Sequence, residues 1–416
     1  MKEVNIGIVG FGTVGAGVVE NIYKNLDLLV ERAGVVPVIK KIADLDITSD
    51  RGVEVDSSIL TTDVNEVLNG EDIDIVVELI GGTTFAKTVI ETALKNGKSV
   101  VTANKALLAE SVKDLFETAE ANGVDLYYEA SVGGGIPCIK TLREGLISNN
   151  INTIMGILNG TCNYIFTRME REKIPFEVIL PQAQAAGYAE AEPSLDVDGF
   201  DTAHKTVILA SWATGTNYTL DDVYIEGIRN VALEDVSIAA EIGYRIKLIA
   251  TIKQTEKGMS LCVQPTMIPA ASMLGCVNEV FNAVWFNGDT VGDVMMYGPG
   301  AGRAATASAV VADIMDIAKN IDNGCCGRIP AFKTSANPVA PLAIDQNEAT
   351  FYLRAPESQA ADVKAALAEI GVKVKEERTM HGSAILFTTP IVYSQLSELK
   401  ASFKDLIAIR LELLSS

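Results

Sequence analysis

Short apolar runs and helical stretches alternate over residues 1–135 of the chain. The runs have the length and β-branched composition typical of buried strands: VNIGIV, VPVIKKIA, DIDIVVELI, KSVVT and VDLYYEA. Helical patterns follow the first run and cover residues 87–95 and 106–121. This alternation predicts an α/β fold with a Rossmann-type doubly wound parallel sheet.

The later pattern changes character twice. A helix is predicted from residue 136 to about 149, and DTAHKTVILASWATG reads as a helix that ends at Gly215. Alternation typical of strands fills residues 220–299, and the order strand, helix, strand, strand, helix, strand follows from Ala349 onward. We therefore expect four segments: a dinucleotide-binding domain over 1–135 with a return segment at 300–330, a substrate-binding and dimerisation domain over 136–299, a linker over 331–348 and a small α+β domain over 349–416.

The glycine-rich turn after the first strand predicts a dinucleotide site. The sequence Gly10-Phe11-Gly12-Thr13-Val14-Gly15 lies between a strand and a helix. The first glycine permits the tight turn, the second allows backbone N–H groups to approach a pyrophosphate, and the third lets the helix pack closely. The phosphates would lie at the positive end of the helix dipole.

Two further positions bear on the cofactor. An acid at the end of the second strand favours NAD and a cation favours NADP, but Asp44 follows Lys40 and Lys41, so the choice stays open. The stretch VTANK carries Thr102 and Lys105 at the carboxyl end of a strand, where open α/β sheets bind ligands. Lys105 is either a ligand contact or a solvated surface lysine.

The stretch YEASVGGGIP allows two interpretations. Glu129 at a strand end, followed by three glycines whose carbonyls can turn inward, could ring a hard monovalent cation. The alternative is a flexible loop with Pro137 in the first turn of the next helix.

Composition excludes several classes of partner. The net charge of −20, from 34 basic and 54 acidic side chains, argues against nucleic acid and anionic membranes. The amino-terminal run is short and interrupted by glycines, and no apolar stretch is long enough to span a bilayer, so we expect a cytoplasmic protein. The six cysteines form no C-x-x-C pair, and we expect them to be reduced thiols.

An acid-rich segment, GYAEAEPSLDVDGFDTAHK, ends on a lysine within a predicted helix. Asp201 and Lys205 are spaced i,i+4 and share one helix face. An exposed pair of this kind stabilises a helix only slightly, but the residues after Lys205 are almost all apolar, which indicates a buried helix. Acids around one buried lysine suit a substrate that carries an ammonium group, with the lysine donating a proton to a carbonyl oxygen as hydride arrives.

This segment resembles the signature of the homoserine dehydrogenase family. The signature is an alanine, three residues, a glycine and an aromatic residue, then the spacing Pro-x-x-Asp-x-x-Gly-x-Asp-x-x-x-Lys. In this chain its positions are Ala183, Gly187, Tyr188, Pro193, Asp196, Gly199, Asp201 and Lys205. The motifs GFGTVG, TANKALLA, EASVGGGIP, LNGTCNYI and YGPGAGR occur in the family's order, so the resemblance covers essentially the whole chain.

The resemblance implies reversible NAD(P)H-dependent reduction of L-aspartate 4-semialdehyde to L-homoserine, in the biosynthesis of threonine, methionine and isoleucine. It makes Lys205 the proton donor, with Asp201 paired to it, and assigns the substrate ammonium to Glu190 and Asp196. It places Lys105 between cofactor and substrate. The implied cofactor contacts are Phe11, Thr13, Val14, Gly187 and Gly302, and the implied Na⁺ or K⁺ ligands are Glu129 and the carbonyls of Val132, Gly134 and Ile136.

The chain departs from the family pattern at three places. Ala43 stands where an arginine is common before the acid that ends the second strand, which weakens an NADP assignment, and Ala305 stands where proline is usual. The carboxy-terminal module resembles an ACT domain, which in this family responds to threonine. Its ligand loop, usually Asp-x-Pro-Gly, reads APESQAADV, so threonine binding there is open.

Two other functions remain in competition. Cys162 could be the attacking thiolate of a cysteine-dependent aldehyde dehydrogenase, although His204 is the only histidine before the carboxy-terminal module. A non-enzymatic sensor could combine the nucleotide domain with the ACT-like module, but it has no use for Asp201 and Lys205. The apolar middle segment favours a homodimer or homotetramer.

Overall fold

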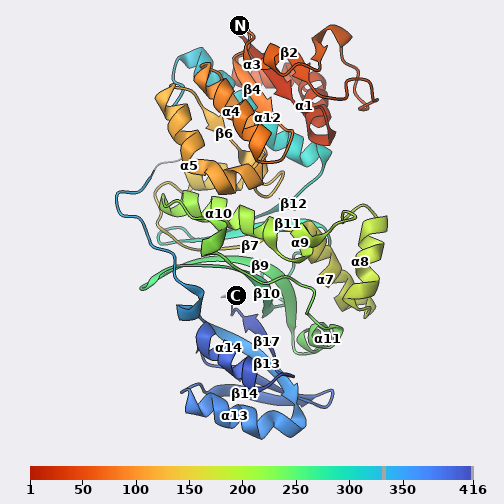
Figure 1. Ribbon diagram of the computed structural model, residues 1–416, viewed down its shortest axis with the longest axis vertical. Helices are drawn as coiled ribbons and strands as arrows, with labels where there is room; N and C mark the ends of the chain where they lie inside the picture. The colour runs from red at the N-terminus through yellow and green to blue at the C-terminus, as the bar shows by residue number, and fades with distance from the viewer. Residues whose placement is uncertain (330–333, 414–416) are drawn as a thin grey trace. The chain divides into compact units, whose positions relative to one another are not determined.

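The computed structural model describes residues 1–329 and 334–413 (Figure 1). Its contacts divide the chain into two compact units. The first comprises Met1–Asn149, Val207–Leu220 and Gly298–Pro338, and the second comprises Asn150–Thr206, Asp221–Tyr297 and Val339–Ser416. The boundary therefore falls inside one helix, α10 (Phe200–Thr214). Residues 330–333 of the predicted return segment and linker, and 414–416 of the last predicted domain, lie outside the described residues.

The first unit is built on a parallel sheet with the order β3-β2-β1-β4-β5-β6. This order is that of a doubly wound nucleotide-binding fold, which confirms the predicted fold class. The strand order reverses between β1 and β4, with successive strands added on opposite sides of this point, so a crevice is expected at their carboxyl ends. The strands are β1 (Glu3–Val9), β2 (Val36–Ala43), β3 (Leu60–Thr61), β4 (Ile75–Glu78), β5 (Ser99–Thr102) and β6 (Leu126–Tyr127).

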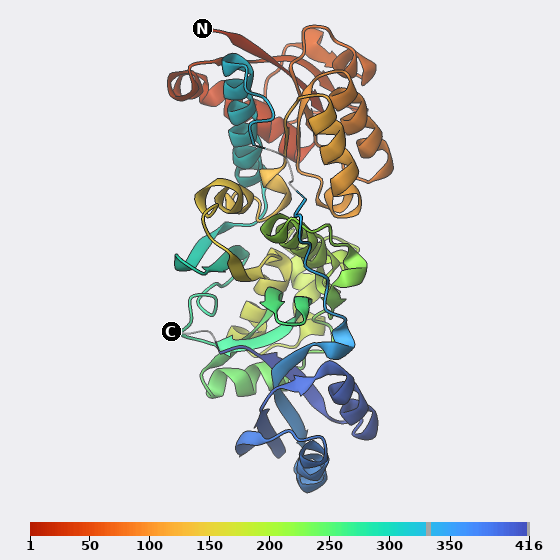
Figure 2. The same ribbon diagram turned by 90° about the vertical axis from the view of Figure 1, so that its left-hand side faces the viewer.

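Helices cover this sheet, and one of them comes from a distant part of the chain. The helices are α1 (Thr13–Lys24), α2 (Leu26–Ala33), α3 (Asn65–Leu68), α4 (Thr84–Lys95), α5 (Lys105–Ala121) and α12 (Arg303–Asn323). Figures 1 and 2 show α12, in teal, among the red and orange elements of the first unit. Its apolar side chains, among them Val310 and Ile314, share a core with Ile6 and Val18. Gly17 allows this approach, because a Cβ there would lie 2.8 Å from Cγ of Arg303.

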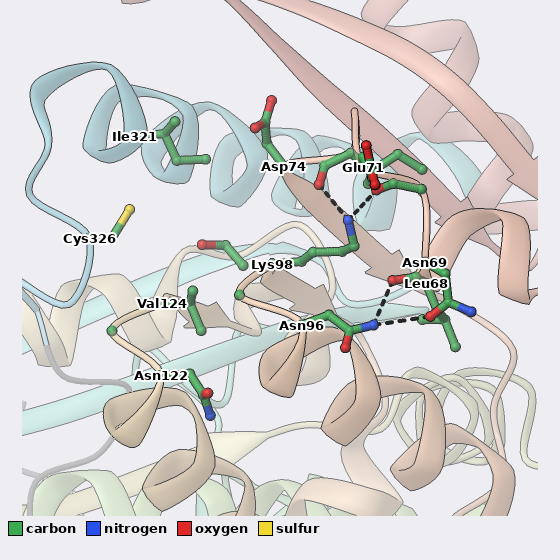
Figure 3. Close-up of a pocket in the computed structure, with 15 residues that line it drawn as sticks. Leu68, Asn69, Glu71, Asp74, Asn96, Lys98, Asn122, Val124, Ile321 and Cys326 are labelled. Carbon is green, nitrogen blue, oxygen red and sulfur yellow. Dashed lines mark hydrogen bonds between the residues drawn. The ribbon is translucent and has the colours of Figure 1, made fainter.

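A hollow of about 750 Å³ opens at the amino ends of β4 and β5 (Figure 3). The amine of Lys98 reaches into its wall and donates hydrogen bonds to the carbonyls of Gly70 at 2.5 Å and Ile73 at 2.8 Å. Helices α3, α4 and α5 all end nearby, so their negative dipole ends face this edge. A phosphate is therefore disfavoured here, and the cofactor is expected at the opposite, carboxyl edge.

The second unit is built on a long mixed sheet with the order β12-β11-β7-β9-β10-β17-β13-β15-β14. Most of its neighbours are antiparallel, whereas β10 and β17 are parallel. The strands are β7 (Ile151–Ile157), β9 (Tyr244–Thr255), β10 (Gly258–Pro269), β11 (Phe281–Gly288), β12 (Gly292–Pro299), β13 (Glu348–Pro356), β14 (Val374–Met380), β15 (Ser383–Thr388) and β17 (Ile407–Leu411), with β8 (Tyr224–Ile225) and β16 (Ile391–Val392) at its side.

The helices of the second unit fall into two groups along the chain. Between β7 and β9 lie α7 (Gly160–Glu172), α8 (Phe176–Ala185), α9 (Ser194–Val197), the first part of α10, and α11 (Leu233–Glu241). The last segment runs β13, α13 (Ala360–Glu369), β14, β15, α14 (Tyr393–Ser402), β17, which is the predicted order with β16 added. This segment has a core of its own, which includes Phe351, Leu367 and Leu396. Its likeness to an ACT domain stays a prediction.

Three local predictions need correction. The helix predicted from residue 136 to about 149 is a short turn, α6 (Cys138–Lys140), followed by a widened π-type turn (Thr141–Gly145) in which Leu146 N–H reaches the carbonyl of Thr141. Burial of Arg143 over the ring of Tyr127, at 4.2 Å, accompanies this widened turn. The strand VDLYYEA shortens to β6, and the sequence pattern missed α2, α3, α8, α9 and α11. Within the described residues, no helix has the length and apolar character needed to cross a membrane.

Candidate active site

The glycine-rich turn of the first unit has the geometry that a pyrophosphate needs. Gly10 has φ +105°. Packing requires a glycine at position 15, because a Cβ there would lie 2.1 Å from the carbonyl oxygen of Gly10. At Gly12, by contrast, an added Cβ would meet nothing within 4 Å. The backbone of Gly12 thus borders open space at the amino end of α1, which begins at Thr13, with Val14 next to it.

Asp44 ties the end of β2 to this turn. Its Oδ2 accepts a hydrogen bond from Phe11 N–H at 2.5 Å, and its Oδ1 accepts one from Asp46 N–H at 2.9 Å. A guanidinium nitrogen of Arg51 lies 3.9 Å from Oδ1. A carboxylate and a cation therefore stand together at the position that reads the cofactor's 2′ group, so the geometry leaves NAD and NADP both open.

A cavity of about 290 Å³ lies at the carboxyl ends of β4 and β5. Thr102 donates its hydroxyl to Glu78 Oε2 at 2.6 Å, and the Asn104 side chain caps α5 by accepting Leu107 N–H at 3.1 Å. Lys105 begins α5 and lines this cavity together with Val14, Glu78, Leu79, Gly81, Gly82, Ala103, Asn104 and Ala106. Lys105 is thus a wall residue of the cavity and not a remote surface lysine.

The buried Glu129 carboxylate lies at the start of α6. It accepts the N–H groups of Ile139 at 2.9 Å and Lys140 at 2.7 Å, and burial raises its pKa to about 7. The carbonyl of Val132 accepts the thiol of Cys138, and the carbonyl of Ile136 accepts Cys138 N–H. Gly134 has φ +56° and lies against the backbone of Gly300. Within residues 1–329 and 334–413, no cluster of three or more His, Cys, Asp or Glu side chains is arranged to hold a metal ion.

In the second unit, Lys205 and Asp201 form a buried ion pair on α10. Lys205 Nζ lies 2.7 Å from Asp201 Oδ2 and 2.6 Å from the carbonyl oxygen of Leu158, at the end of β7. The two side chains are only 10% and 7% exposed. The apolar residues 207–210 are buried as predicted, whereas Trp212 is partly buried, and α10 ends just before Gly215, which has φ +65°. The pair is therefore not a solvated surface contact.

Asp196 joins this pair through an asparagine. The Asn159 side-chain amide lies 2.7 Å from Asp196 Oδ1 and 2.9 Å from Asp201 Oδ2. Thr161 Oγ1 lies 3.3 Å from the other oxygen of Asp196. Burial, and next the charge of Asp201, raise the pKa of Asp196. One ammonium and two carboxylates thus meet where β7, α9 and α10 approach one another.

The remaining acids of the segment separate into different surroundings. Glu192 accepts hydrogen bonds from Ser194, and Asp198 forms an ion pair with Arg229. Glu190 is exposed, in the loop that turns at Gly187 with φ +76°. The expectation that Glu190, Glu192, Asp196 and Asp198 all crowd the lysine is therefore too broad, because Glu192 bonds to Ser194, two residues away, and Asp198 pairs with Arg229, 31 residues away. Gly302, with φ +111°, precedes α12 in the first unit.

Cys162 is a buried thiol. Burial, followed by the charges of Asp196 and Asp201, raises its pKa well above the usual range. It donates a hydrogen bond to the carbonyl of Asp196 at 3.3 Å. A nucleophilic thiolate needs the opposite surroundings, so this geometry disfavours the aldehyde dehydrogenase hypothesis.

Comparison with known proteins identifies the family to which the chain belongs. The family model "Homoserine dehydrogenase, NAD binding domain" matches residues 10–129, and "Homoserine dehydrogenase" matches residues 137–315. The chain belongs to the homoserine dehydrogenase family. It is 43% identical to the homoserine dehydrogenase of Bacillus subtilis over 327 residues, which cover 79% of this chain and 76% of that protein.

Solved homoserine dehydrogenases share the fold. The enzyme from Thiobacillus denitrificans superposes with a TM-score of 0.93 at 36% identity, covering 100% of this chain and 99% of that one. A hyperthermophilic archaeal homoserine dehydrogenase solved in complex with NADPH gives a TM-score of 0.66 at 27% identity, covering 76% of this chain and 97% of that one. Membership of this family makes the chain an NAD(P)-dependent oxidoreductase that acts on a CH–OH group.

Sequence reasoning missed several residues of the site. Asn159 lies in the motif LNGTCNYI without an assigned role, although an asparagine between a strand and a helix is a recognisable N-cap signal. Glu78 ends β4 with no pattern to distinguish it from the apolar run before it. The hydrogen bond from Thr102 to Glu78 joins two strands and has no local sequence signal.

Proposed function

We propose that the chain catalyses the reversible reduction of L-aspartate 4-semialdehyde to L-homoserine, with Lys205 as the proton donor. The observation that carries the proposal is the buried Lys205–Asp201 pair with Asp196 beside it. An aldehyde that accepts hydride develops negative charge on its oxygen, and a buried ammonium both stabilises that charge and supplies the proton. The nicotinamide, when bound, supplies the hydride.

The acids have separate proposed tasks. Asp201 holds the Lys205 amine toward the reacting oxygen and binds the substrate hydroxyl in the reverse direction. Asp196, which is partly buried beside the ion pair, and Glu190, in the exposed loop, bind the substrate ammonium, which needs negative charge close by. In the reverse reaction Lys205 takes the hydroxyl proton as hydride leaves carbon, so charge and atoms balance.

The cofactor contacts are proposed residue by residue, beginning with the glycine-rich turn. Gly10, Phe11, Gly12, Thr13, Val14 and Gly15 would hold the pyrophosphate, because the turn leaves room at Gly12 before the amino end of α1. Asp44 would contact the adenosine ribose, and Thr102, Lys105, Gly187 and Gly302 would approach the nicotinamide side. NAD and NADP are both compatible with these residues.

A monovalent cation, Na⁺ or K⁺, is proposed at Glu129 and the carbonyls of Val132, Gly134 and Ile136. The support is a buried carboxylate in one loop with these backbone oxygens. Activity measured with choline chloride replaced stepwise by NaCl or KCl at constant ionic strength tests this. Equal rates in all three salts would dispose of the cation.

The central assay measures homoserine oxidation with NAD⁺ and with NADP⁺ by absorbance of the reduced cofactor. We expect turnover with at least one of them, and a loss of kcat by orders of magnitude in Lys205→Ala with cofactor binding retained. Unchanged turnover of Lys205→Ala would refute the assignment. Cys162→Ser separates the aldehyde dehydrogenase alternative, because it should leave the activity nearly intact here and abolish it there.

Two further proposals concern regulation and assembly. The segment over residues 349–413 supports an ACT-like role through its order of strands and helices, and threonine is the proposed effector. Isothermal titration with threonine, alongside the assay, tests this. If threonine produces no heat of binding and no inhibition, the segment has a structural role instead. We also propose a homodimer or homotetramer in the cytoplasm, which light scattering and cell fractionation can check.

A further inference from the structure

The side chain of Asn159 links the two carboxylates of the proposed substrate site, Asp196 and Asp201. It lies at the junction of β7 and α7 and is 5% exposed. Its Oδ1 accepts the N–H of Cys162 at 2.9 Å and so caps α7. Its Nδ2 lies 2.7 Å from Asp196 Oδ1 and 2.9 Å from Asp201 Oδ2. The cap fixes which end of the amide carries the oxygen, because only an oxygen can accept an N–H.

The amide matches what two neighbouring carboxylates need. Two anionic groups in one buried site repel each other, and one of them tends to take up a proton. A side-chain NH₂ carries two hydrogens and can give one to each carboxylate, which favours both charged forms. Burial, and next the charge of Asp201, raise the pKa of Asp196, whereas the hydrogen bond from Asn159 lowers it.

Two consecutive residues, Leu158 and Asn159, bind the two members of the ion pair. The carbonyl of Leu158 accepts from Lys205 Nζ at 2.6 Å, and the next residue, Asn159, donates to Asp201. Asp201 Oδ2 receives hydrogen bonds from Lys205 and from Asn159, so its orientation is set by a group on another element as well as by its own helix. The residues that follow β7 therefore fix the positions of the Lys205 amine and the Asp201 carboxylate.

We propose that Asn159 is a positioning residue for the reaction: its amide bonds to Asp196 and Asp201 together and orients Asp201 against Lys205. Asn159 does not itself exchange a proton with the substrate. This inference rests on the proposed function, because it assigns the two carboxylates to ammonium binding and proton transfer. It also predicts a specific effect of removing the amide: the carboxylates that bind the substrate should lose their charge at a higher pH than in the wild type.

Two substitutions separate the cap from the donor. Asn159→Ser keeps an uncharged cap acceptor for α7 and removes the NH₂ group. Asn159→Asp keeps both the cap and the shape but replaces the donor by a third carboxylate. Asn152→Ser is the matched control, because Asn152 lies on β7 with an exposed side chain bonded to Asn287.

The experiment measures kcat, KM and the pH profile of kcat/KM for homoserine oxidation in the intact chain, with the thermal midpoint of each variant. We expect Asn159→Ser to lower kcat/KM roughly ten- to a hundred-fold. The acid limb of its profile should move to higher pH, because a carboxylate without the donor binds its proton more readily. Asn159→Asp should move the limb further, whereas Asn152→Ser should match the wild type in rate and profile.

The outcomes distinguish a failure of the Asn159 role from a failure of the proposed function. A wild-type chain that oxidises homoserine, with an Asn159→Ser variant of unchanged rate and profile, would overturn the positioning role alone. A loss of activity that follows a fall in the thermal midpoint, with the acid limb unmoved in both variants, would also overturn it, since a cap alone explains that result. A wild-type chain inactive with both cofactors would instead refute the proposed function.

Discussion

Lys205 Nζ lies 2.7 Å from Oδ2 of Asp201, one helical turn before it on α10, and both side chains are nearly inaccessible to water. On an exposed helix such a pair would contribute about 0.3–0.5 kcal/mol. Burial changes its meaning, because removing two charges from water costs several kcal/mol that their attraction only partly returns. A pair of this kind is weak evidence for stability, and its retention is better explained by a task at the site.

A double-mutant cycle on this pair tests that argument. Lys205→Met leaves the Asp201 carboxylate buried without its ammonium, and we expect a loss of about 3 kcal/mol in the free energy of unfolding. Lys205→Met combined with Asp201→Leu removes both charges, so the double variant should recover most of the loss while remaining inactive. Urea unfolding of the four proteins measures the cycle. A double variant less stable than Lys205→Met would contradict the argument.

Two glycines of the same turn should behave differently when replaced by alanine. At Gly15 the new Cβ would lie 2.1 Å from Gly10 O, so we expect a destabilisation of about 2 kcal/mol or more. At Gly12 the Cβ enters open space, so Gly12→Ala should fold with a stability within about 1 kcal/mol of the wild type. Its cofactor KM should nevertheless rise at least about ten-fold, because the methyl group occupies the approach to the pyrophosphate.

Thermal unfolding and initial rates at varied cofactor concentration check both variants. A Gly12→Ala protein with an unchanged cofactor KM would show that the pyrophosphate does not lie over this turn. A Gly15→Ala protein as stable as the wild type would show that α1 can move away from the strand, against the close packing seen between them.

Local signals in the sequence account for the local structures of the candidate site that the fold contains. The Gly10 to Gly15 turn and the i,i+4 spacing of Asp201 and Lys205 follow from the order of residues within one turn or helix. The apolar run after Lys205 was sufficient to indicate a buried helix. These features depend on neighbours in the chain, so a single sequence reveals them.

Features that depend on distant partners were not predictable in this way. Asp198 forms an ion pair with Arg229, 31 residues later, and so leaves the group of acids that the segment suggested. The helix expected from residue 136 fails where Arg143 packs on Tyr127, a ring from β6. Tertiary packing overrides local propensity at such positions. For the same reason the bridging role of Asn159 became visible only once its partners were placed.

Asp44 offers a test of cofactor preference. Its two oxygens accept Phe11 N–H and Asp46 N–H, so Asp44→Asn keeps an acceptor for the Phe11 bond, gives up the Asp46 bond and loses the charge that favours a ribose diol. We expect kcat/KM with NAD⁺ to fall roughly ten-fold and that with NADP⁺ to hold or rise. Asp50→Asn, at an exposed aspartate of the same loop that caps Gly52 N–H, is the control. An unchanged ratio of the two rates would mean that Asp44 serves only the turn.

Lys247 on β9 is a buried amine outside the proposed active site. Its Nζ lies 2.8 Å from Asn163 Oδ1 and 2.7 Å from the carbonyl of Val277, and both partners are uncharged. Burial, and next the charge of Arg245, lower the pKa of Lys247 from its ordinary 10.5 to about 7. The unfolded chain therefore binds a proton between pH 7 and 10.5 that the folded chain does not hold.

This difference fixes the sign of a pH effect on stability. Stability rises with pH wherever the unfolded state binds more protons, so Lys247 makes the free energy of unfolding increase from about pH 7 toward 10.5, and its penalty is constant below pH 7. Lys247→Met removes the amine and should remove this contribution, so that the wild type gains stability over the variant as the pH rises through that window. Lys253→Met, at an exposed lysine of the same strand, is the control. Urea unfolding at several pH values between 6 and 10 measures both differences, and a difference for Lys247→Met that stays flat across the window would show that this amine keeps its proton in the fold.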